Sequence, residues 1–140
     1  MELELRHLTV SLNGREILHS IDCRVKNGCF LSLLGPSGCG KSTLLKTIAG
    51  ILPQTAGEVW LGGACADDLP PHKRGAVIVF QDVRLFPHLT AEENVSFPMK
   101  MQGIGQQERR AKASALLERV QLSGMEQRRP HQLSGGQQQR

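Results

Sequence analysis

One segment, Gly35–Ser42, reads Gly-Pro-Ser-Gly-Cys-Gly-Lys-Ser and satisfies the pattern Gly-x-x-x-x-Gly-Lys-Ser/Thr in full. An apolar run, Phe30–Leu34, precedes it, and Lys41–Ala49 follows with apolar residues at helical spacing. The pattern is typical of a loop that binds phosphate groups between a strand and a helix. It would arise by chance in about one random chain in two hundred of this length. A glycine-rich turn with a surface lysine is the alternative, and the surrounding pattern favours the phosphate loop.

The residue types in this loop suit a triphosphate. Gly38 and Gly40 let the backbone curl, so that several main-chain N–H groups converge on an anion at a helix N-terminus. Lys41 can reach the β- and γ-phosphates, the Ser42 hydroxyl can bind Mg²⁺, and Thr43 can bond an α-phosphate oxygen. The predicted nucleotide-binding residues are Gly35, Pro36, Ser37, Gly38, Cys39, Gly40, Lys41, Ser42 and Thr43.

Two runs are apolar on both faces, Phe30–Leu34 and Ala76–Phe80. Such runs are typical of strands buried in the middle of a parallel or mixed sheet. A shorter strand is expected at Glu58–Leu61, where two glycines end it.

Two hairpins are predicted near the N-terminus. Leucine alternates with charge along Leu3–Val10, which predicts a half-buried strand that leads to a turn at Asn13–Gly14. A second alternating stretch is followed by Asn27–Gly28, so we expect another turn and a strand that begins at Cys29. The first part of the chain is therefore expected to be rich in antiparallel strands.

The chain becomes helical in its second half. Thr90 is expected to cap a helix, because acidic residues that suit the helix dipole follow in the first turn. An amphipathic pattern predicts a second helix over Gln106–Gln121. We therefore predict a nucleotide-binding core with a β portion over residues 1–89 and a helical subdomain over residues 90–140.

Composition excludes several classes of protein. The 140 residues include 21% charged residues and carry a net charge of +4, values typical of a soluble globular chain. No apolar run approaches the ~20 residues that span a bilayer, and the amino terminus lacks the pattern of a secretion signal. The four cysteines form no Cys-x-x-Cys pair, so no metal cluster is expected. The modest basic excess does not indicate nucleic-acid binding.

A nucleotide hydrolase also needs a carboxylate at the end of a neighbouring strand, to hold the Mg²⁺ shell, and a group that orients water. Gln81 stands directly after the Ala76–Phe80 run, where its neutral amide could coordinate Mg²⁺ and water. Asp82 comes one residue later and is the alternative carboxylate.

A second glycine motif lies near the end of the chain, at Leu133–Gln137. Ser134 can cap a helix, and the glycines that follow allow the backbone to approach a large anion. The pentapeptide taken alone is also typical of an exposed loop.

Taken together, Gly35–Thr43, Gln81 and Leu133–Gln137 resemble the ATP-binding cassette (ABC) ATPase subunit of a transporter, over the whole chain. The sequence around Phe80–Thr90 is most similar to bacterial importers of small solutes or inorganic ions. The resemblance implies an α/β fold: an incomplete P-loop NTPase core with an N-terminal antiparallel β portion and a C-terminal helical subdomain.

The resemblance also implies roles for residues. It makes Gly35–Thr43 the Walker A loop, with Lys41 and Gln81 as catalytic residues and Ser42 and Gln81 as Mg²⁺ ligands. The signature motif, which faces the ATP of a second subunit, would consist of Ser134, Gly135, Gly136 and Gln137.

The resemblance also bears on one further segment and on one single position. The segment Arg84–His88 resembles the docking site for a membrane-spanning partner, and core packing of Leu85 and Phe86 is the alternative. Leu12 stands where the family places an aromatic residue against adenine, so an apolar contact would replace stacking there.

The function implied is ATP binding and hydrolysis that drive solute transport, with ATP and Mg²⁺ as cofactors. The implied partners are membrane-spanning permease subunits and a second ATPase subunit in a head-to-tail dimer, at the cytoplasmic face of the membrane. The Walker B aspartate and the catalytic glutamate would follow Arg140, so the chain is expected to be an N-terminal piece with negligible hydrolysis of its own. The alternatives are a soluble ABC-type ATPase unconnected with transport, a non-hydrolysing nucleotide-binding fragment, and a P-loop kinase.

Overall fold

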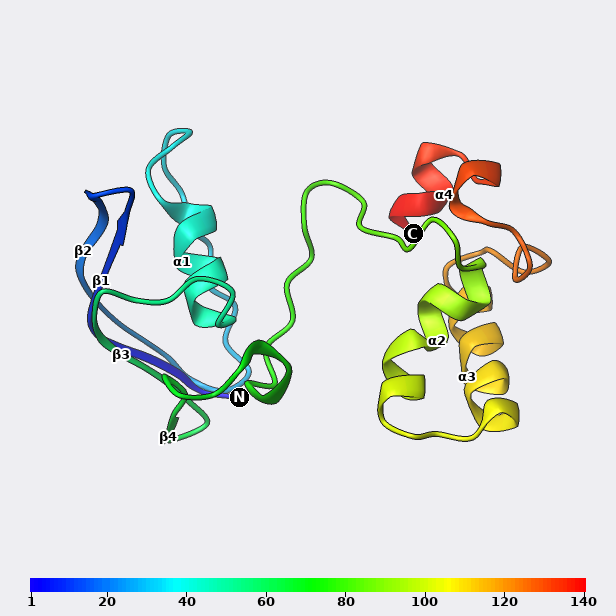
Figure 1. The fold of residues 1–140 in the computed structure, drawn as a ribbon, viewed down its shortest axis with the longest axis horizontal. Coiled ribbons are helices and arrows are strands. Elements are labelled where there is room, and N and C mark those ends of the chain that lie inside the picture. The colour runs from blue at the N-terminus through cyan, green and yellow to red at the C-terminus, as the bar shows by residue number, and fades with distance from the viewer. The chain divides into compact units, whose positions relative to one another are not determined.

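The computed structural model describes all residues, 1–140, and the chain forms two compact units, Met1–Val79 and Phe80–Arg140. The first unit contains the strands and one α-helix, and the second contains the remaining α-helices (Figure 1). None of the helices is both long and apolar enough to cross a bilayer. The predicted division into residues 1–89 and 90–140 stays a prediction.

The first unit is built on a four-stranded antiparallel sheet with the order β2-β1-β3-β4. The turn at Asn13–Gly14 has two positive φ angles, 51° and 76°, which match the twist of a tight hairpin. The first predicted hairpin is therefore confirmed. The strands are β1 (Leu3–Leu12), β2 (Arg15–Val25), β3 (Ala56–Leu61) and β4 (Ala64–Cys65).

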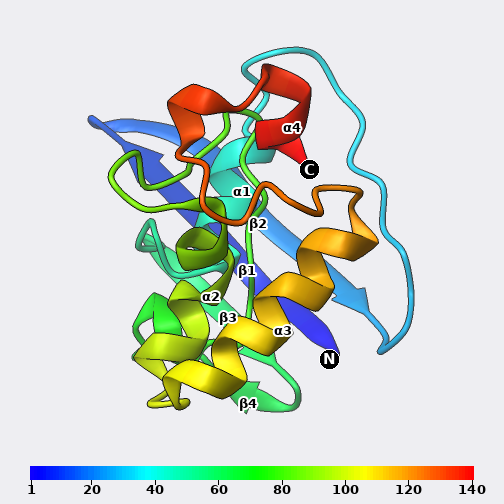
Figure 2. The same ribbon diagram turned by 90° about the vertical axis from the view of Figure 1, so that its right-hand side faces the viewer.

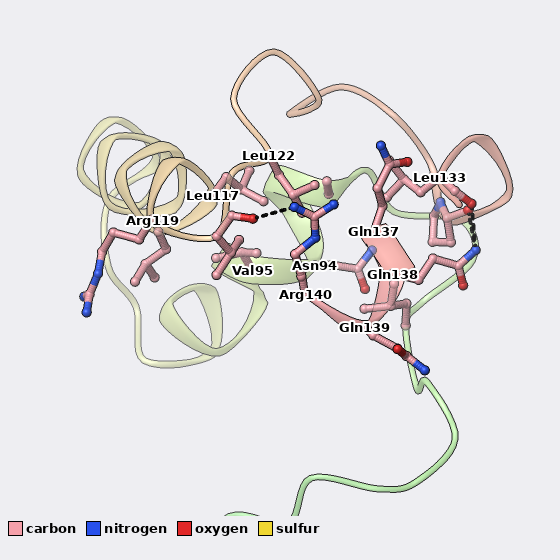
Figure 3. Close-up of a pocket in the computed structure, with 15 residues that line it drawn as sticks. Asn94, Val95, Leu117, Arg119, Leu122, Leu133, Gln137, Gln138, Gln139 and Arg140 are labelled. Carbon is pink, nitrogen blue, oxygen red and sulfur yellow. Dashed lines mark hydrogen bonds between the residues drawn. The ribbon is translucent and has the colours of Figure 1, made fainter. Parts of the chain in front are cut away.

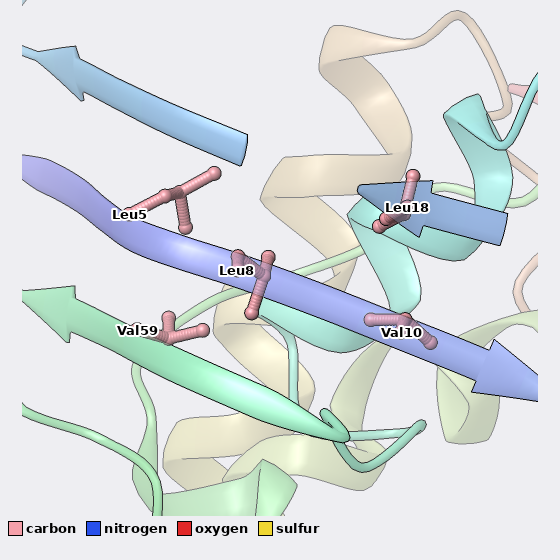
Figure 4. Packing of buried hydrophobic residues seen from close by; sticks show 5 residues of the cluster. All are labelled: Leu5, Leu8, Val10, Leu18 and Val59. Carbon is pink, nitrogen blue, oxygen red and sulfur yellow. The ribbon is translucent and has the colours of Figure 1, made fainter. Parts of the chain in front are cut away.

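One face of this sheet carries the core of the unit, which is a cluster of five aliphatic side chains (Figure 4). Leu5 and Leu8 both belong to it although three positions separate them, because the pairing of β1 with β2 is irregular between them and His7 has a φ of 48°. Leu44 and Ile48 from α1 (Lys41–Ile48) pack against the cluster. The five buried residues are Leu5, Leu8, Val10, Leu18 and Val59.

Both predicted central strands are wrong for this structure. Phe30–Leu34 and Ala76–Phe80 lie outside every strand, and the side chains of Phe30 and Val79 are each 95% exposed. The second predicted hairpin is wrong as well, since no strand begins at Cys29. The physical reason is that a buried strand needs hydrogen-bonding neighbours on both edges, and the antiparallel sheet has no place for these segments.

The second unit is helical, with α2 (Ala91–Met101) beside α3 (Gln106–Arg119) and a short α4 (Gly135–Gln139) (Figure 2). The Thr90 cap is confirmed, because its hydroxyl accepts from the N–H of Glu93 while the Glu93 carboxylate accepts from the N–H of Thr90. The start of α3 is also confirmed, and α3 ends two residues before the predicted Gln121. The core residues are Ala91, Leu117, Leu122 and Leu133.

Two single turns of 3₁₀-helix complete the secondary structure, η1 (Pro71–Lys73) in the first unit and η2 (Pro130–Gln132) in the second. Both begin at a proline, whose fixed φ suits the first position of a helical turn.

Thr47 in α1 allows a test of the packing. Its side chain is fully buried, and its hydroxyl has no hydrogen-bond partner. Because an unpaired buried hydroxyl is unfavourable, we expect Thr47→Val to leave the free energy of unfolding unchanged or raise it by about 1 kcal/mol in thermal denaturation. Thr90→Val, which removes a bonded cap, should lower it by about 1 kcal/mol. A Thr47→Val variant as unstable as Thr90→Val would contradict this account.

Candidate functional site

The path of the glycine loop is set by its contact with the sheet. Gly40, the residue before α1, has a φ of 94°, a backbone conformation that favours glycine. A Cβ atom at this position would lie 2.8 Å from Leu18 Cδ2 and 3.2 Å from Ile17 Cγ2. The loop can therefore pass this close to β2 only because residue 40 has no side chain.

The first turn of α1 presents main-chain donors that the chain itself does not use. The first hydrogen bond of the helix runs from the N–H of Leu44 to the carbonyl of Gly40, at 2.9 Å. No side chain caps the helix, and the N–H groups of Lys41, Ser42 and Thr43 have no acceptor among the hydrogen bonds of the chain. Donors at the positive end of a helix dipole form a binding place for an anion.

The Lys41 ammonium lies within the same loop. Its Nζ donates to the carbonyl oxygens of Gly35, at 2.8 Å, and Pro36, at 2.7 Å, and lies 3.5 Å from the Cys39 Sγ. These oxygens hold the positive charge beside the free amides of the first turn. Phosphate oxygens are stronger acceptors than carbonyl oxygens for an ammonium, so the contacts can be exchanged for a bound phosphate.

The other loop residues are open to solvent or to a ligand. Pro36, Ser37 and Ser42 are exposed, and Thr43 is half-buried. No side-chain hydrogen bond within the chain involves either hydroxyl of Ser42 or Thr43. The oxygen of the Ser42 hydroxyl is thus free to coordinate Mg²⁺, which prefers oxygen ligands and keeps phosphate oxygens and water as further ligands.

The other predicted site residues belong to the second unit. Gln81 and Asp82 are both exposed and lie in a bend that is neither strand nor helix. Gly35–Thr43 form one continuous loop and helix start in the first unit, whereas Gln81 belongs to the second unit.

The second glycine motif forms the start of α4. The Ser134 hydroxyl accepts from the N–H of Gln137 at 3.3 Å, and the Gln137 side-chain oxygen accepts from the N–H of Ser134 at 2.8 Å. The predicted Ser134 cap is therefore confirmed. A Cβ added at Gly135 or Gly136 would meet nothing within 4 Å, so the backbone between the two bonded side chains is open.

An apolar groove of about 630 Å³ lies beside this motif in the second unit (Figure 3). Leucine and valine side chains from α2, α3 and the loop after α3 form much of its wall, and Gln137 and Gln138 contribute from α4. The Gln138 amide donates to the carbonyls of Pro130 and Leu133, which fixes α4 at the edge of the groove. The groove contains no residue of the phosphate loop.

Comparison with known proteins decides the family. The family described as ABC transporter matches residues 18–140, which is most of the chain. The chain belongs to the ABC transporter family. This membership and the structural similarity below confirm the fold class expected from the sequence: an incomplete P-loop NTPase core, an N-terminal antiparallel portion and a helical subdomain.

Several ABC relatives are proteins named spermidine/putrescine import ATP-binding protein PotA. The protein from Legionella pneumophila (strain Lens) is 45% identical over 138 residues, which cover 99% of this chain and 38% of the relative. The protein from Roseobacter denitrificans is 50% identical over the same length and share. The chain thus spans well under half the length of these curated relatives.

The chain is also similar to solved ABC structures. One is the dimeric structure of a post-hydrolysis state of the ATP-binding cassette MJ0796 bound to ADP and Pi. It is 34% identical, with a TM-score of 0.83 over 97% of this chain and 65% of that chain. Binding of ATP is a property of this ABC family.

The sequence did not predict two residues whose side chains hold other segments of the backbone in place. Arg74 is buried against the end of α1, and Asn94 on α2 binds the loop before its own helix. Asn94 accepts from the N–H of Phe86 at 2.8 Å and donates to the carbonyls of Phe86, Leu89 and Thr90 at 2.9–3.2 Å. Helical spacing carries no signal for either role, because both depend on backbone atoms of other segments.

The contact between loop and sheet predicts that substitutions of two glycines differ in their effect on the free energy of unfolding. Gly40→Ala should lower the free energy of unfolding by the αL strain of about 1–2 kcal/mol, and by a further 1–3 kcal/mol or so from the clash with Leu18 and Ile17. Gly38→Ala is the matched control, because its φ is 83° and nothing lies within 4 Å of its Cβ. Urea denaturation of both variants measures the difference. Equal losses would contradict the proposed contact.

Proposed function

We propose that this protein is the ATP-binding subunit of an ABC importer, and that Gly35–Thr43 binds the triphosphate of Mg-ATP. The observation that carries the proposal is the group of free N–H donors at Lys41–Thr43 with the Lys41 ammonium beside them. Each charge-assisted hydrogen bond from such a donor to a phosphate oxygen contributes about 1.5–3 kcal/mol. Several of them acting together are sufficient for micromolar affinity.

Each loop residue has a part in this binding. The Lys41 Nζ exchanges the carbonyls of Gly35 and Pro36 for phosphate oxygens, while the main-chain donors hold the phosphate chain at the start of α1. Ser42 and Gln81 are proposed to hold Mg²⁺, which would neutralise charge on the phosphate oxygens. We propose Gln81 also as the residue that orients water. Hydrolysis, the activity of the family, is proposed for the whole protein.

A second copy is proposed to complete the nucleotide site. The open backbone at Gly135 and Gly136, with Ser134 at the helix start, can face the γ-phosphate of an ATP held by another subunit. Two subunits in a head-to-tail arrangement would then hold two nucleotides. The dimeric form of the similar MJ0796 cassette supports this proposal.

The membrane partner is proposed to dock at Arg84–His88. The Asn94 side chain holds the backbone of this region at Phe86, and the Phe86 ring packs on Phe97 with ring centroids 4.6 Å apart. A loop ordered in advance loses little entropy when a partner binds. We propose a location at the cytoplasmic face of the membrane, and the names of the relatives, which are import ATP-binding proteins, support this proposal.

The nucleotide proposal predicts a dependence on Lys41. Isothermal titration of the chain with Mg-ATP should show binding that Lys41→Ala weakens by about tenfold to a hundredfold, because a charge-assisted contact is lost. Lys46→Ala, on the last turn of the same helix, is the control and should bind as the wild type does. No uptake of Mg-ATP by folded protein, or uptake that ignores Lys41, would contradict the proposal.

The docking proposal predicts a dependence on Asn94. Asn94→Ala removes the four hydrogen bonds that order the loop. We expect about tenfold weaker association with the permease subunits in a binding assay, and an unchanged Kd for Mg-ATP. Gln107→Ala, at an exposed position on α3, serves as the control. Unchanged association of the Asn94 variant would refute this role.

A further inference from the structure

Arg74 is the only ionisable side chain buried in the chain, with 6% of its surface exposed. No carboxylate lies within ion-pair distance of it. A buried charge is strongly unfavourable unless hydrogen bonds replace its hydration. The hydrogen-bond partners of the guanidinium therefore explain how its charge is stabilised without a carboxylate.

The guanidinium binds main-chain carbonyls from two segments. Its Nη1 donates to Thr47, at 3.1 Å, and Ile48, at 3.3 Å, in the last turn of α1. Its Nε donates to the carbonyl of Leu69 at 2.9 Å, and its Nη2 donates to that of Asp67 at 3.2 Å. The carbonyls at a helix C-terminus lack partners within the helix and form the negative end of its dipole, so a cation suits them.

The backbone at the end of α1 leaves room for this side chain. Gly50 follows the last turn with a φ of 77°, and a Cβ there would fall 2.4 Å from the Arg74 Nε. A side chain at residue 50 would enter the space that the guanidinium occupies beside the carbonyls. A lysine in place of Arg74 could not span both segments, because its ammonium lacks the planar fork of donors.

The far end of the same helix carries the phosphate loop. α1 has eight residues, a length of about 12 Å, so a tilt of the helix at its C-terminus displaces the N–H groups of its first turn. Gly40 fixes the start of α1 against β2, and Arg74 fixes its end.

We propose that Arg74 is a positioning residue for nucleotide binding: it anchors the C-terminus of α1 to the Asp67–Leu69 loop and so keeps the Lys41–Thr43 amides convergent on the phosphates. This inference rests on the proposed function of the loop. Arg74 therefore contributes to the affinity for nucleotide although its side chain lies outside the phosphate loop.

The test titrates the full chain with Mg-ATP and compares wild type, Arg74→Lys and Arg74→Met, at temperatures well below each unfolding midpoint. Calorimetry reports Kd and stoichiometry separately. Arg74→Met should raise Kd about tenfold at full stoichiometry, and Arg74→Lys should raise it by a smaller factor. A merely structural role would lower the stoichiometry of binding sites and leave Kd unchanged. Arg128→Met, at an exposed arginine, is the matched control.

Each outcome decides the inference. A folded Arg74→Met variant with the wild-type Kd overturns it and leaves the proposed function intact. If Arg74→Met does not fold, the Lys variant decides in the same way, since a wild-type Kd for folded Arg74→Lys also overturns it. Wild-type protein that binds no Mg-ATP overturns the proposed function, and this inference with it.

Discussion

The N–H groups in the first turn of α1 need an acceptor that the chain does not supply, and the rest of the first unit holds them in place. Gly40 turns the chain at a backbone angle that favours glycine and contacts β2 closely. The hydrophobic cluster on β1, β2 and β3 supports the side of α1 that carries Leu44 and Ile48. The small sheet therefore supports the N-terminus of α1, and this helix end is the one that can bind a phosphate.

The other helix starts show how unusual this arrangement is within the chain. In α2 and α4 the cap side chain, Thr90 or Ser134, accepts from one first-turn N–H, in a reciprocal pair with a residue three positions later. The other two first-turn N–H groups of α2 donate to main-chain carbonyls, and α4 has no cation like Lys41 in its first turn. The start of α3 also lacks a side-chain cap, but Glu108 places a negative charge in its first turn. Only α1 combines free donors with a cation, Lys41, and no acidic residue in its first turn.

Local patterns predicted local structure well. The helix after the glycine loop, the Thr90 and Ser134 caps and the start of α3 depend on residues within a few positions of one another, and the structure has them all. Phe30–Leu34 was mispredicted because burial of a strand depends on distant neighbours that an apolar run does not specify. Arg74 was missed for a similar reason, since its acceptors are backbone carbonyls 5 to 27 positions away.

The most direct test of the account is to follow the backbone amides by ¹⁵N NMR while Mg-ATP is added to the chain. If the free donors of α1 hold the phosphates, the largest chemical-shift changes will fall on the amides of Lys41, Ser42 and Thr43, and the amides in the first turn of α3 will not move. Saturating Mg-ATP that leaves the three α1 amides unshifted, or that shifts the α3 amides instead, would contradict it.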